Sequence, residues 1–292
     1  MAKFEYLLSL TPRESWRILR HRLPGLRGGP SWQPHELIYS SKHGRGIRFA
    51  ELLLRQEAVV ARAMAWEPLN FEGKRVVEVG CGPLGGYGPL ALYCGAASFE
   101  SAEPEWDATL FESPEVAEKY LFIFYADLVA LYGQRMDFES FRKILRERMQ
   151  IQNCGFEKFT MADKADIVIS QSCLEHVFPI EGTIDKLAEI QHAKTRFLHL
   201  VDFGNHYPTG NPLDGLYEQP RDDYIARRGK AMNLLRAPDI DALFKSRNIP
   251  AKVIPSRFVK ETYRGHINPW WRERYDEDAL FTQLAIVASP AA

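Results

Sequence analysis

A glycine-rich turn directly after a short apolar run constrains this chain more than any other feature. Residues 76–85 are Val-Val-Glu-Val-Gly-Cys-Gly-Pro-Leu-Gly, so glycines recur at positions 80, 82 and 85. Glycine permits a sharp turn and lets the backbone approach a ligand closely, and a helix that starts there presents free N–H groups. We therefore expect a strand over residues 74–79, a ligand-binding turn over 80–88 and a helix to about Cys94.

The rest of the chain alternates apolar β-branched runs with amphipathic segments, which is typical of a parallel α/β sheet. An amphipathic helix is predicted over residues 49–65, and a long helical stretch begins at Ser113 and continues to about Gln150. From 292 residues we expect one domain over 49–292, preceded by a helical extension over 1–48 and carrying a helical insertion at about 105–150. The further strands are predicted at 98–102, 165–170, 196–202, 251–255 and 281–288.

Residues 1–30 differ from the rest in charge, because they contain six basic residues against two acidic ones. A capping box at Thr11–Glu14 predicts the start of a helix on which Trp16, Leu19 and Leu23 recur at helical spacing. We expect this helix to pack on its own domain with its arginines in water. The alternative is a helix that docks on a membrane surface or on a partner protein.

Composition excludes several classes of protein. The formal net charge is −1, so there is no global basic field and we expect no nucleic-acid partner. The four cysteines lack CxxC spacing, which indicates reduced thiols and a cytoplasmic protein. The N-terminus lacks the apolar core of a signal peptide, and no apolar run reaches the roughly 18 residues that a membrane span needs.

Two acidic residues flank the glycine-rich turn. Glu78 lies two residues before the first glycine, where its carboxylate can receive a cationic amino-acid group. Glu103 lies just past the second predicted strand, where a carboxylate can accept both hydroxyls of a ribose. The GxGxxG spacing alone decides little, since nicotinamide and flavin domains share it. The two carboxylates narrow the choice of ligand.

Three segments, taken in order, resemble motifs of class I S-adenosylmethionine-dependent methyltransferases: EVGCGPLGG at 78–86, SAEP at 101–104 and DIVISQSCLEHV at 166–177. The resemblance implies an α/β, Rossmann-like fold with a seven-stranded mixed sheet and helices on both faces. It also implies S-adenosylmethionine as cofactor. The residues expected to bind it are Glu78, Gly80, Cys81, Gly82, Pro83, Glu103, Pro104 and Gln171.

The chain departs from the family pattern at two places. The acidic residue expected near the adenine is displaced by the helical stretch, and Asp163 is the nearest candidate. The usual proline-glycine-glycine turn before the fifth strand is replaced by Ala193-Lys194-Thr195. An NAD(P)-binding Rossmann oxidoreductase is the chief alternative, although it explains neither Glu78 nor the LEHV segment. A non-catalytic scaffold that keeps the fold is a second alternative.

The acceptor should bind beyond the carboxyl ends of the strands, where ligands of such sheets lie. Polar residues follow the fourth strand (Gln171, Ser172, Glu175 and His176) and the fifth strand (Asp202 to Tyr207). Histidine is the usual base near neutral pH. We predict His206 as the base, with Asp202 orienting it or sharing the task, and His176 as the second candidate. His199 is the third, and it should face away from Asp202 because three residues along a strand reverse the face.

A bacterial methyltransferase subfamily shares the pattern formed here by Asp202, His206, Asn233 and Arg236. This subfamily is often met among surface-polysaccharide genes, which implies O-methylation of a sugar or another small hydroxyl acceptor. Asp202 and His206 could instead be two ligands of a magnesium ion, but hard cations prefer several oxygens and we expect no metal. The paired Trp270 and Trp271 should pack in an apolar corner.

Overall fold

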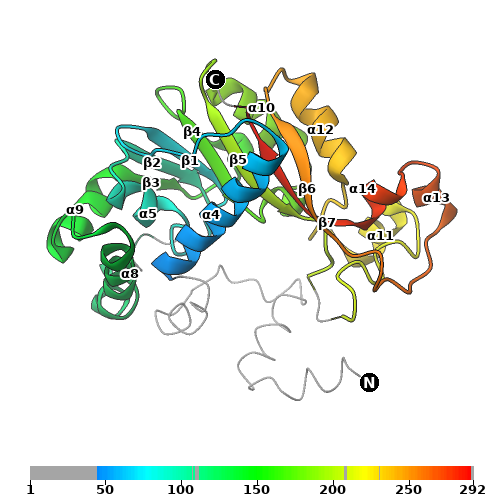
Figure 1. Ribbon diagram of the computed structural model, residues 1–292, viewed down its shortest axis with the longest axis horizontal. Coiled ribbons are helices and arrows are strands. Elements are labelled where there is room, and N and C mark those ends of the chain that lie inside the picture. Colours follow the sequence, from blue (N-terminus) through cyan, green and yellow to red (C-terminus); the bar gives the residue numbers. More distant parts are fainter. Residues whose placement is uncertain (1–44, 107, 109–111, 207–208, 230, 291–292) are drawn as a thin grey trace.

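The computed structural model describes residues 45–106, 108, 112–206, 209–229 and 231–290. Their centre is a seven-stranded sheet with the strand order β3-β2-β1-β4-β5-β7-β6, in which β7 alone runs antiparallel to both of its neighbours. The expected seven-stranded mixed sheet is therefore confirmed (Figure 1). Its strands are β1 (Arg75–Val79), β2 (Ser98–Ala102), β3 (Met149–Gln152), β4 (Ile167–Gln171), β5 (Arg196–Asp202), β6 (Lys252–Phe258) and β7 (Thr282–Ala288).

Helices cover both faces of the sheet, because successive side chains of each buried strand point to opposite faces. Val76 and Ile167 pack into one apolar cluster with α4 (Gly46–Ala63), α5 (Gly88–Tyr93), α8 (Phe122–Tyr132) and α9 (Phe138–Arg148). Val77 and Val168, the next residues along, pack into a second cluster with α10 (Glu181–Ile190) and α12 (Ala237–Ser246). Both faces of the sheet are thus buried.

Helix α4 begins three residues earlier than the sequence predicts. The carboxylate of Asp127, on α8, accepts two hydrogen bonds from Arg45 and one from the backbone N–H of Ile47. A side chain from another helix therefore supplies the acceptor that the first free N–H groups of α4 require. Most of the predicted N-terminal extension, including the helix expected from Thr11, lies outside the described residues.

The predicted continuous helix over 113–150 is wrong in two respects. The segment contains α7 (Pro114–Val116), a π-helical turn η2 (Ala117–Leu121) and α8, which ends at Gly133 with φ +77°. Helix α9 then starts at a new cap, where Asp137 accepts from the N–H of Ser140 at 2.7 Å. Residues 149–152 form β3, because their backbone pairs with the free edge of β2. Non-local pairing overrides the helical pattern there.

A third apolar cluster lies beyond β5 and β7. It includes residues of α11 (Arg221–Arg228), α13 (Pro269–Arg272) and α14 (Glu277–Phe281). Trp271 is fully buried in this cluster, and its indole N–H donates to the carbonyl of Gln219 at 2.8 Å. The predicted apolar corner is confirmed: Trp270 is partly buried and packs against the same cluster, and its ring also contacts the guanidinium of Arg274.

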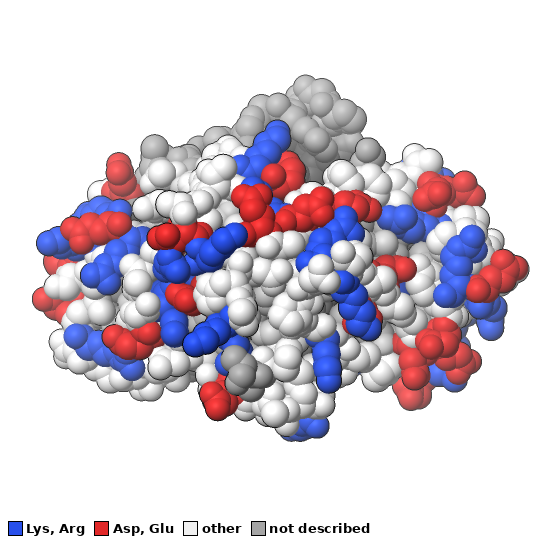
Figure 2. Space-filling view, turned by 90° about the horizontal axis from the view of Figure 1, so that it is seen from above, with Lys and Arg blue, Asp and Glu red and all other residues white. Residues whose placement is uncertain are grey.

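The surface and the thiols add two observations. Acidic and basic side chains are interspersed on the face seen in Figure 2, as the net charge of −1 leads one to expect. Cys81, Cys94, Cys154 and Cys173 carry free thiols. Within the described part of the chain, no helix combines the length and the apolar character that crossing a membrane requires.

Candidate active site

The glycine-rich turn connects β1 to α5 at the carboxyl edge of the sheet. Gly80 and Gly82 adopt φ values of +66° and +67°, the left-handed region that favours glycine. The N–H of Gly82 donates to Oε2 of Glu103 at 2.8 Å, and the N–H of Glu105 donates to Oε1 at 2.9 Å. Both carboxylate oxygens of Glu103 are therefore held by backbone. Burial raises the pKa of Glu103, although these two hydrogen bonds partly oppose the shift.

Glu78 faces inward beneath the same turn. It is 1% exposed, and its Oε2 accepts from the N–H of Tyr87 at 2.8 Å. A Cβ added at Gly86 would overlap that carboxylate, so a glycine is required at this point of the turn. Burial, with a smaller contribution from the charge of Glu103, raises the pKa of Glu78 well above its ordinary value. Glu78 thus holds the N-terminus of α5 and is almost completely enclosed.

The other residues expected to bind cofactor lie around this turn. Oε1 of Gln171, at the end of β4, accepts from Nε2 of Gln56 on α4 at 2.7 Å. The carbonyl of Pro104 accepts from the side-chain amide of Asn153 at 3.2 Å, which ties the segment after β2 to the segment after β3. Cys81 is buried and Pro83 is partly buried within the turn. All of them belong to the carboxyl edge of the sheet.

Asp163 does not reach this edge. Its carboxylate forms an ion pair with Arg75 at 2.9 Å, and its side chain is 71% exposed. Because Arg75 is the first residue of β1, Asp163 lies at the opposite edge of the sheet from the glycine turn. The prediction that Asp163 contacts an adenine there is wrong, and the reason is that Asp163 precedes β4 instead of following a strand.

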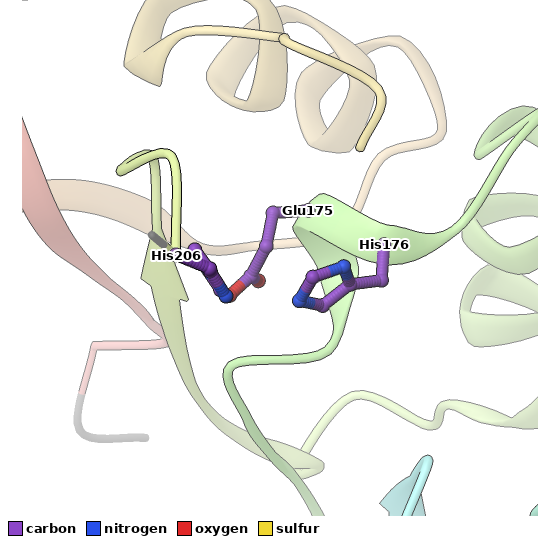
Figure 3. A group of neighbouring side chains, drawn as sticks. All are labelled: Glu175, His176 and His206. Carbon is purple, nitrogen blue, oxygen red and sulfur yellow. The ribbon is translucent and has the colours of Figure 1, made fainter. Parts of the chain in front are cut away.

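Histidine and acidic side chains gather where β4 and β5 end. A short 3-10 turn, η4 (Leu174–His176), follows β4 and brings Glu175 to His206, with 3.9 Å between Oε1 of Glu175 and Nε2 of His206. Nε2 of His206 also lies 3.9 Å from Oδ2 of Asp202. The rings of His176 and His206 meet edge-on with centroids 4.7 Å apart (Figure 3). The structure thus brings together His206, Asp202 and His176, as the sequence predicts.

The electrostatics of this cluster centre on Glu175. The side chain is 2% exposed, and this burial raises the pKa of Glu175 to about 8. The neighbouring charge of Asp202 makes a smaller contribution in the same direction. Its Oε1 accepts from the N–H of Asp202 at 3.2 Å, but its buried Oε2 has no hydrogen-bond partner among the described residues. Loss of surrounding water lowers the pKa of the His176 imidazole. The neutral forms of both side chains are therefore favoured.

Two residues of the subfamily pattern, Asn233 and Arg236, bind the backbone of the segments that carry the cluster. The side-chain amide of Asn233 donates to the carbonyls of Leu174 and Val177, on either side of Glu175 and His176. The guanidinium of Arg236 is 1% exposed and donates to backbone carbonyls only: those of Phe203, Ala279, Leu280 and Thr282. Asn233 thus fixes the turn after β4, and Arg236 fixes the start of the segment that carries His206.

Backbone strain also gathers here. Four described residues other than glycine have positive φ, and three of them, Ser172, His206 and Leu234, lie in the segments that form or support this cluster. Such conformations cost roughly 1–3 kcal/mol each and persist only where the surroundings impose them, which is common at functional sites. The φ of His206 is +55°, so its ring is placed by the fold against local preference.

His199 has no part in this cluster. It is fully buried in β5, where its Nδ1 lies 2.9 Å from Oγ of Ser170 and its ring packs on Phe244. Burial lowers its pKa to about 3. The third candidate for the base is therefore a structural residue.

The glycine turn and the histidine cluster adjoin each other through Cys173. A Cβ added at Gly80 would overlap the Sγ of Cys173, and Cys173 lies two residues before Glu175. The sequence places Glu175 among the polar residues after the fourth strand but does not predict a role for it. The available signal was an acid next to a histidine between two apolar residues, Leu174 and Val177.

Several solved methyltransferase structures align with this chain at low identity. One from Mesorhizobium loti, S-adenosylmethionine dependent, is 13% identical with a TM-score of 0.45 over 79% of this chain and 94% of its own. The magnesium protoporphyrin IX methyltransferase of Synechocystis PCC 6803, with bound SAH, is 13% identical with a TM-score of 0.38 over 94% and 95%. Phosphoethanolamine N-methyltransferase 2 of Haemonchus contortus, in complex with S-adenosylmethionine, is 14% identical with a TM-score of 0.44 over 82% and 52%.

No family model matches this chain, and no curated protein matches it. The similarity to solved structures concerns the fold. The chain itself has an α/β, Rossmann-like architecture, with a seven-stranded mixed sheet and helices on both faces.

Proposed function

We propose that this protein is an S-adenosylmethionine-dependent methyltransferase that methylates a hydroxyl group of a sugar or another small acceptor. The observation that carries the proposal is the contact between two sites at one edge of the sheet. The glycine turn with Glu103 adjoins the cluster of Glu175, His176 and His206 through Cys173. A donor bound at the first site would present its reactive group to an acceptor at the second. The four free thiols favour a cytoplasmic location.

The residues around the glycine turn fit the proposed cofactor. Among the described residues, no atom lies within 4 Å of a Cβ added at Gly82, so this part of the structure leaves room for a ligand in front of the backbone. Glu103 lies at the rim of that space with its carboxylate fixed by two backbone N–H groups, and a fixed carboxylate can accept ribose hydroxyls. Glu78 keeps the turn closed onto α5 from below. The sulfonium cofactor would supply the activated methyl group.

The acceptor side supplies position and a base. Methyl transfer is an in-line displacement, so the protein must hold the acceptor oxygen in near-attack geometry and remove its proton. Nε2 of His206 is the candidate for the proton acceptor in the ring tautomer that carries its proton on Nδ1, because the side chain is 32% exposed and lies just beyond β5. Asp202 is held by the N–H of Gly204, which donates to Oδ1 at 2.9 Å, and its Oδ2 can stabilise the imidazolium that forms.

A sugar is the favoured acceptor class. The support is the subfamily pattern formed by Asp202, His206, Asn233 and Arg236. Asp202 and His206 belong to the polar cluster described above, and Asn233 and Arg236 hold the segments that carry it. The same pattern supports a role in surface-polysaccharide synthesis. A hydroxyl needs a base at neutral pH, and a histidine beside a carboxylate provides one.

Calorimetry and a methyl-transfer assay test the proposal in sequence. We expect the protein to bind S-adenosylmethionine and S-adenosylhomocysteine and to be indifferent to NADH and NADPH. Saturable NADH binding without S-adenosylmethionine binding would establish the oxidoreductase alternative. A panel of nucleotide sugars, free sugars, phenols and amines then identifies the acceptor. Methylation of amines alone would contradict the hydroxyl acceptor, and cofactor binding without any turnover would favour a scaffold.

A further inference from the structure

Three potential ligand atoms converge at the end of β4 and β5. Among the described residues, one group of histidine, cysteine and acidic side chains has donor atoms that all lie within 4.8 Å of one another: Glu175, His176 and His206. Figure 3 shows the carboxylate of Glu175 beside the imidazole of His206, with the ring of His176 next to them. Two imidazoles and one carboxylate form a donor set that metal ions use in proteins.

The tautomer of His176 fits a ligand. Its Nδ1 lies 2.7 Å from the carbonyl oxygen of Ala231, and a carbonyl only accepts, so Nδ1 must carry the proton. In the neutral ring, Nε2 then has a free lone pair. A hydrogen bond from the second ring nitrogen to a backbone carbonyl is the arrangement that orients metal-binding histidines.

The carboxylate of Glu175 points to the same conclusion independently. The side chain is 2% exposed, and its Oε2 is buried without any hydrogen-bond partner in the part of the chain that is described. Leaving a buried polar atom unpaired costs free energy, and native proteins seldom do so without a reason. Nε2 of His206 lies 3.9 Å from Oε1 of Glu175 and 3.4 Å from the carbonyl oxygen of Asp202, so it binds an ion in the tautomer that carries its proton on Nδ1.

We propose that Glu175, His176 and His206 bind one divalent transition-metal ion, such as Zn²⁺, Mn²⁺ or Fe²⁺. Imidazole nitrogen favours these ions over Mg²⁺, which prefers oxygen ligands. The donor atoms lie within 4.8 Å of one another and need to approach by up to about 1.4 Å, since ligands at about 2.1 Å from a tetrahedral ion lie about 3.4 Å apart. Three protein ligands leave a coordination position open for an oxygen of the acceptor.

The site itself does not depend on the methyltransferase proposal, but its role in catalysis rests on it. A bound ion lowers the pKa of a coordinated hydroxyl, so the acceptor loses its proton more easily. The lone pair on Nε2 of His206 cannot bind the ion and accept a proton at the same time. With the ion bound, His206 is a ligand, and Asp202, whose Oδ2 lies 3.9 Å from His206 Nε2, is the nearest free carboxylate for the proton.

Titration of the chelator-treated full-length protein with Zn²⁺ by calorimetry, and with Co²⁺ by visible absorption, tests the site. We expect one ion per chain with micromolar or tighter affinity, weakened at least tenfold in Glu175→Gln and His206→Ala. His266 is exposed and outside the cluster, so His266→Ala is the matched control and should bind the ion normally. Absence of stoichiometric binding, or equal binding by all the variants, would overturn the proposal.

A measurement on the wild-type protein guards against a variant that fails to fold. Zn²⁺ should protect His176 and His206 from diethyl pyrocarbonate while His266 remains reactive, and equal reactivity with and without Zn²⁺ refutes the site. The two proposals also fail differently. Normal S-adenosylhomocysteine binding without ion binding contradicts the metal site alone, whereas ion binding without S-adenosylhomocysteine binding contradicts the methyltransferase alone.

Discussion

The two halves of the candidate active site differ in how completely their polar groups are paired. At the glycine turn, backbone N–H groups engage both oxygens of Glu103 and one oxygen of Glu78. At the histidine cluster, Oε2 of Glu175 has no partner among the described residues, and His206 meets its polar neighbours at 3.4–3.9 Å. The polar groups at the glycine turn are therefore already paired with backbone, whereas those at the histidine cluster can still form further bonds.

This difference separates two tasks. A cofactor that is bound at every turnover is best met by groups that are already oriented, because no reorganisation is then needed. Chemistry requires groups that can still change partners, by taking up a proton or by coordinating an ion. The incomplete pairing of Glu175 and His206 is therefore what a reacting site needs, and removing these side chains should affect turnover more than binding.

The largest expected effect is on turnover in His206→Ala. The rate should fall about 10²–10⁴-fold, the usual contribution of a positioned base, while affinity for S-adenosylhomocysteine stays nearly unchanged because the residue lies on the acceptor side. Asp202→Asn should lose less if Asp202 only orients the ring. Single-turnover rates and calorimetry measure the two quantities separately.

The same experiment distinguishes the possible roles of His206. Near wild-type turnover in His206→Ala would transfer the role of base to His176. Rates measured with chelator and then with Zn²⁺ separate a base, which works without an ion, from a ligand, which does not.

Glu103→Ala should reduce cofactor affinity at the glycine turn. Loss of a carboxylate that accepts two ribose hydroxyls should cost about 2–4 kcal/mol of cofactor affinity. Burial raises the pKa of Glu103, and in the proposed cofactor site the ribose hydroxyls would donate to the ionised form. Wild-type affinity should therefore decline as the pH falls through that raised pKa, at a higher pH than for an ordinary glutamate. Calorimetry with S-adenosylhomocysteine across a pH series measures both effects.

Glu103→Gln is the control for the pH dependence, because its amide does not titrate. A Glu103→Ala variant with unchanged affinity would remove Glu103 from the cofactor site, and a variant that melts far below wild type would show that the carboxylate mainly holds the turn.

The junction between the halves can be tested at Gly80. Gly80→Ala should destabilise the fold by about 2–3 kcal/mol, because the added Cβ overlaps Sγ of Cys173 in addition to the cost of the left-handed backbone. The Cβ of Gly82→Ala would meet no atom of the described residues within 4 Å, and Gly82 has nearly the same φ, so this variant should cost only about 1 kcal/mol. Urea denaturation compares the two variants.

Cys173→Ala provides the second arm of this experiment. If the overlap is the cause, Gly80→Ala should be much less destabilising in the Cys173→Ala background, and an unchanged cost there would place the strain in the backbone alone.

The smallest expected effect concerns His199, the histidine that belongs to neither half. Its folded pKa of about 3 lies below the ordinary value of 6.5, so the folded state resists protonation. The stability it contributes is complete above pH 6.5 and is lost as the pH falls from there toward 3. Between pH 7.5 and 5.5 the loss is about 1.4 kcal/mol. His199→Gln should lack this part of the acid sensitivity in urea denaturation, and an identical pH dependence would contradict it.

The sequence predicts the parts of this molecule that local signals determine. Strands rich in β-branched residues and the glycine turn fall within a few residues of their predicted places. β3 was missed because Met149–Gln152 continues a helical pattern and is half polar, so only pairing with β2 makes it a strand. Asp163 was misplaced because nearness in sequence to a strand does not say at which end of it a residue lies.

The candidate site was predicted residue by residue but not as an arrangement. His206 is 30 residues from His176, and its left-handed backbone has no local signal. The contacts that hold the two segments come from further along the chain: Asn233 bonds to the turn that carries His176, and Arg236 bonds to Phe203, near His206. The unpaired oxygen of Glu175 depends on burial, which no pattern in residues 171–177 indicates.

Arg236 connects two parts of the chain that are far apart in sequence, the segment after β5 and the start of β7. Its guanidinium binds the carbonyl of Phe203, at the entrance to the segment of His206, and those of Ala279, Leu280 and Thr282, where β7 begins. If either end moves away, the buried guanidinium loses hydrogen bonds that it cannot replace with water, which is unfavourable. The histidine segment and the last strand should therefore open as one cooperative unit, with amides that exchange hydrogen together.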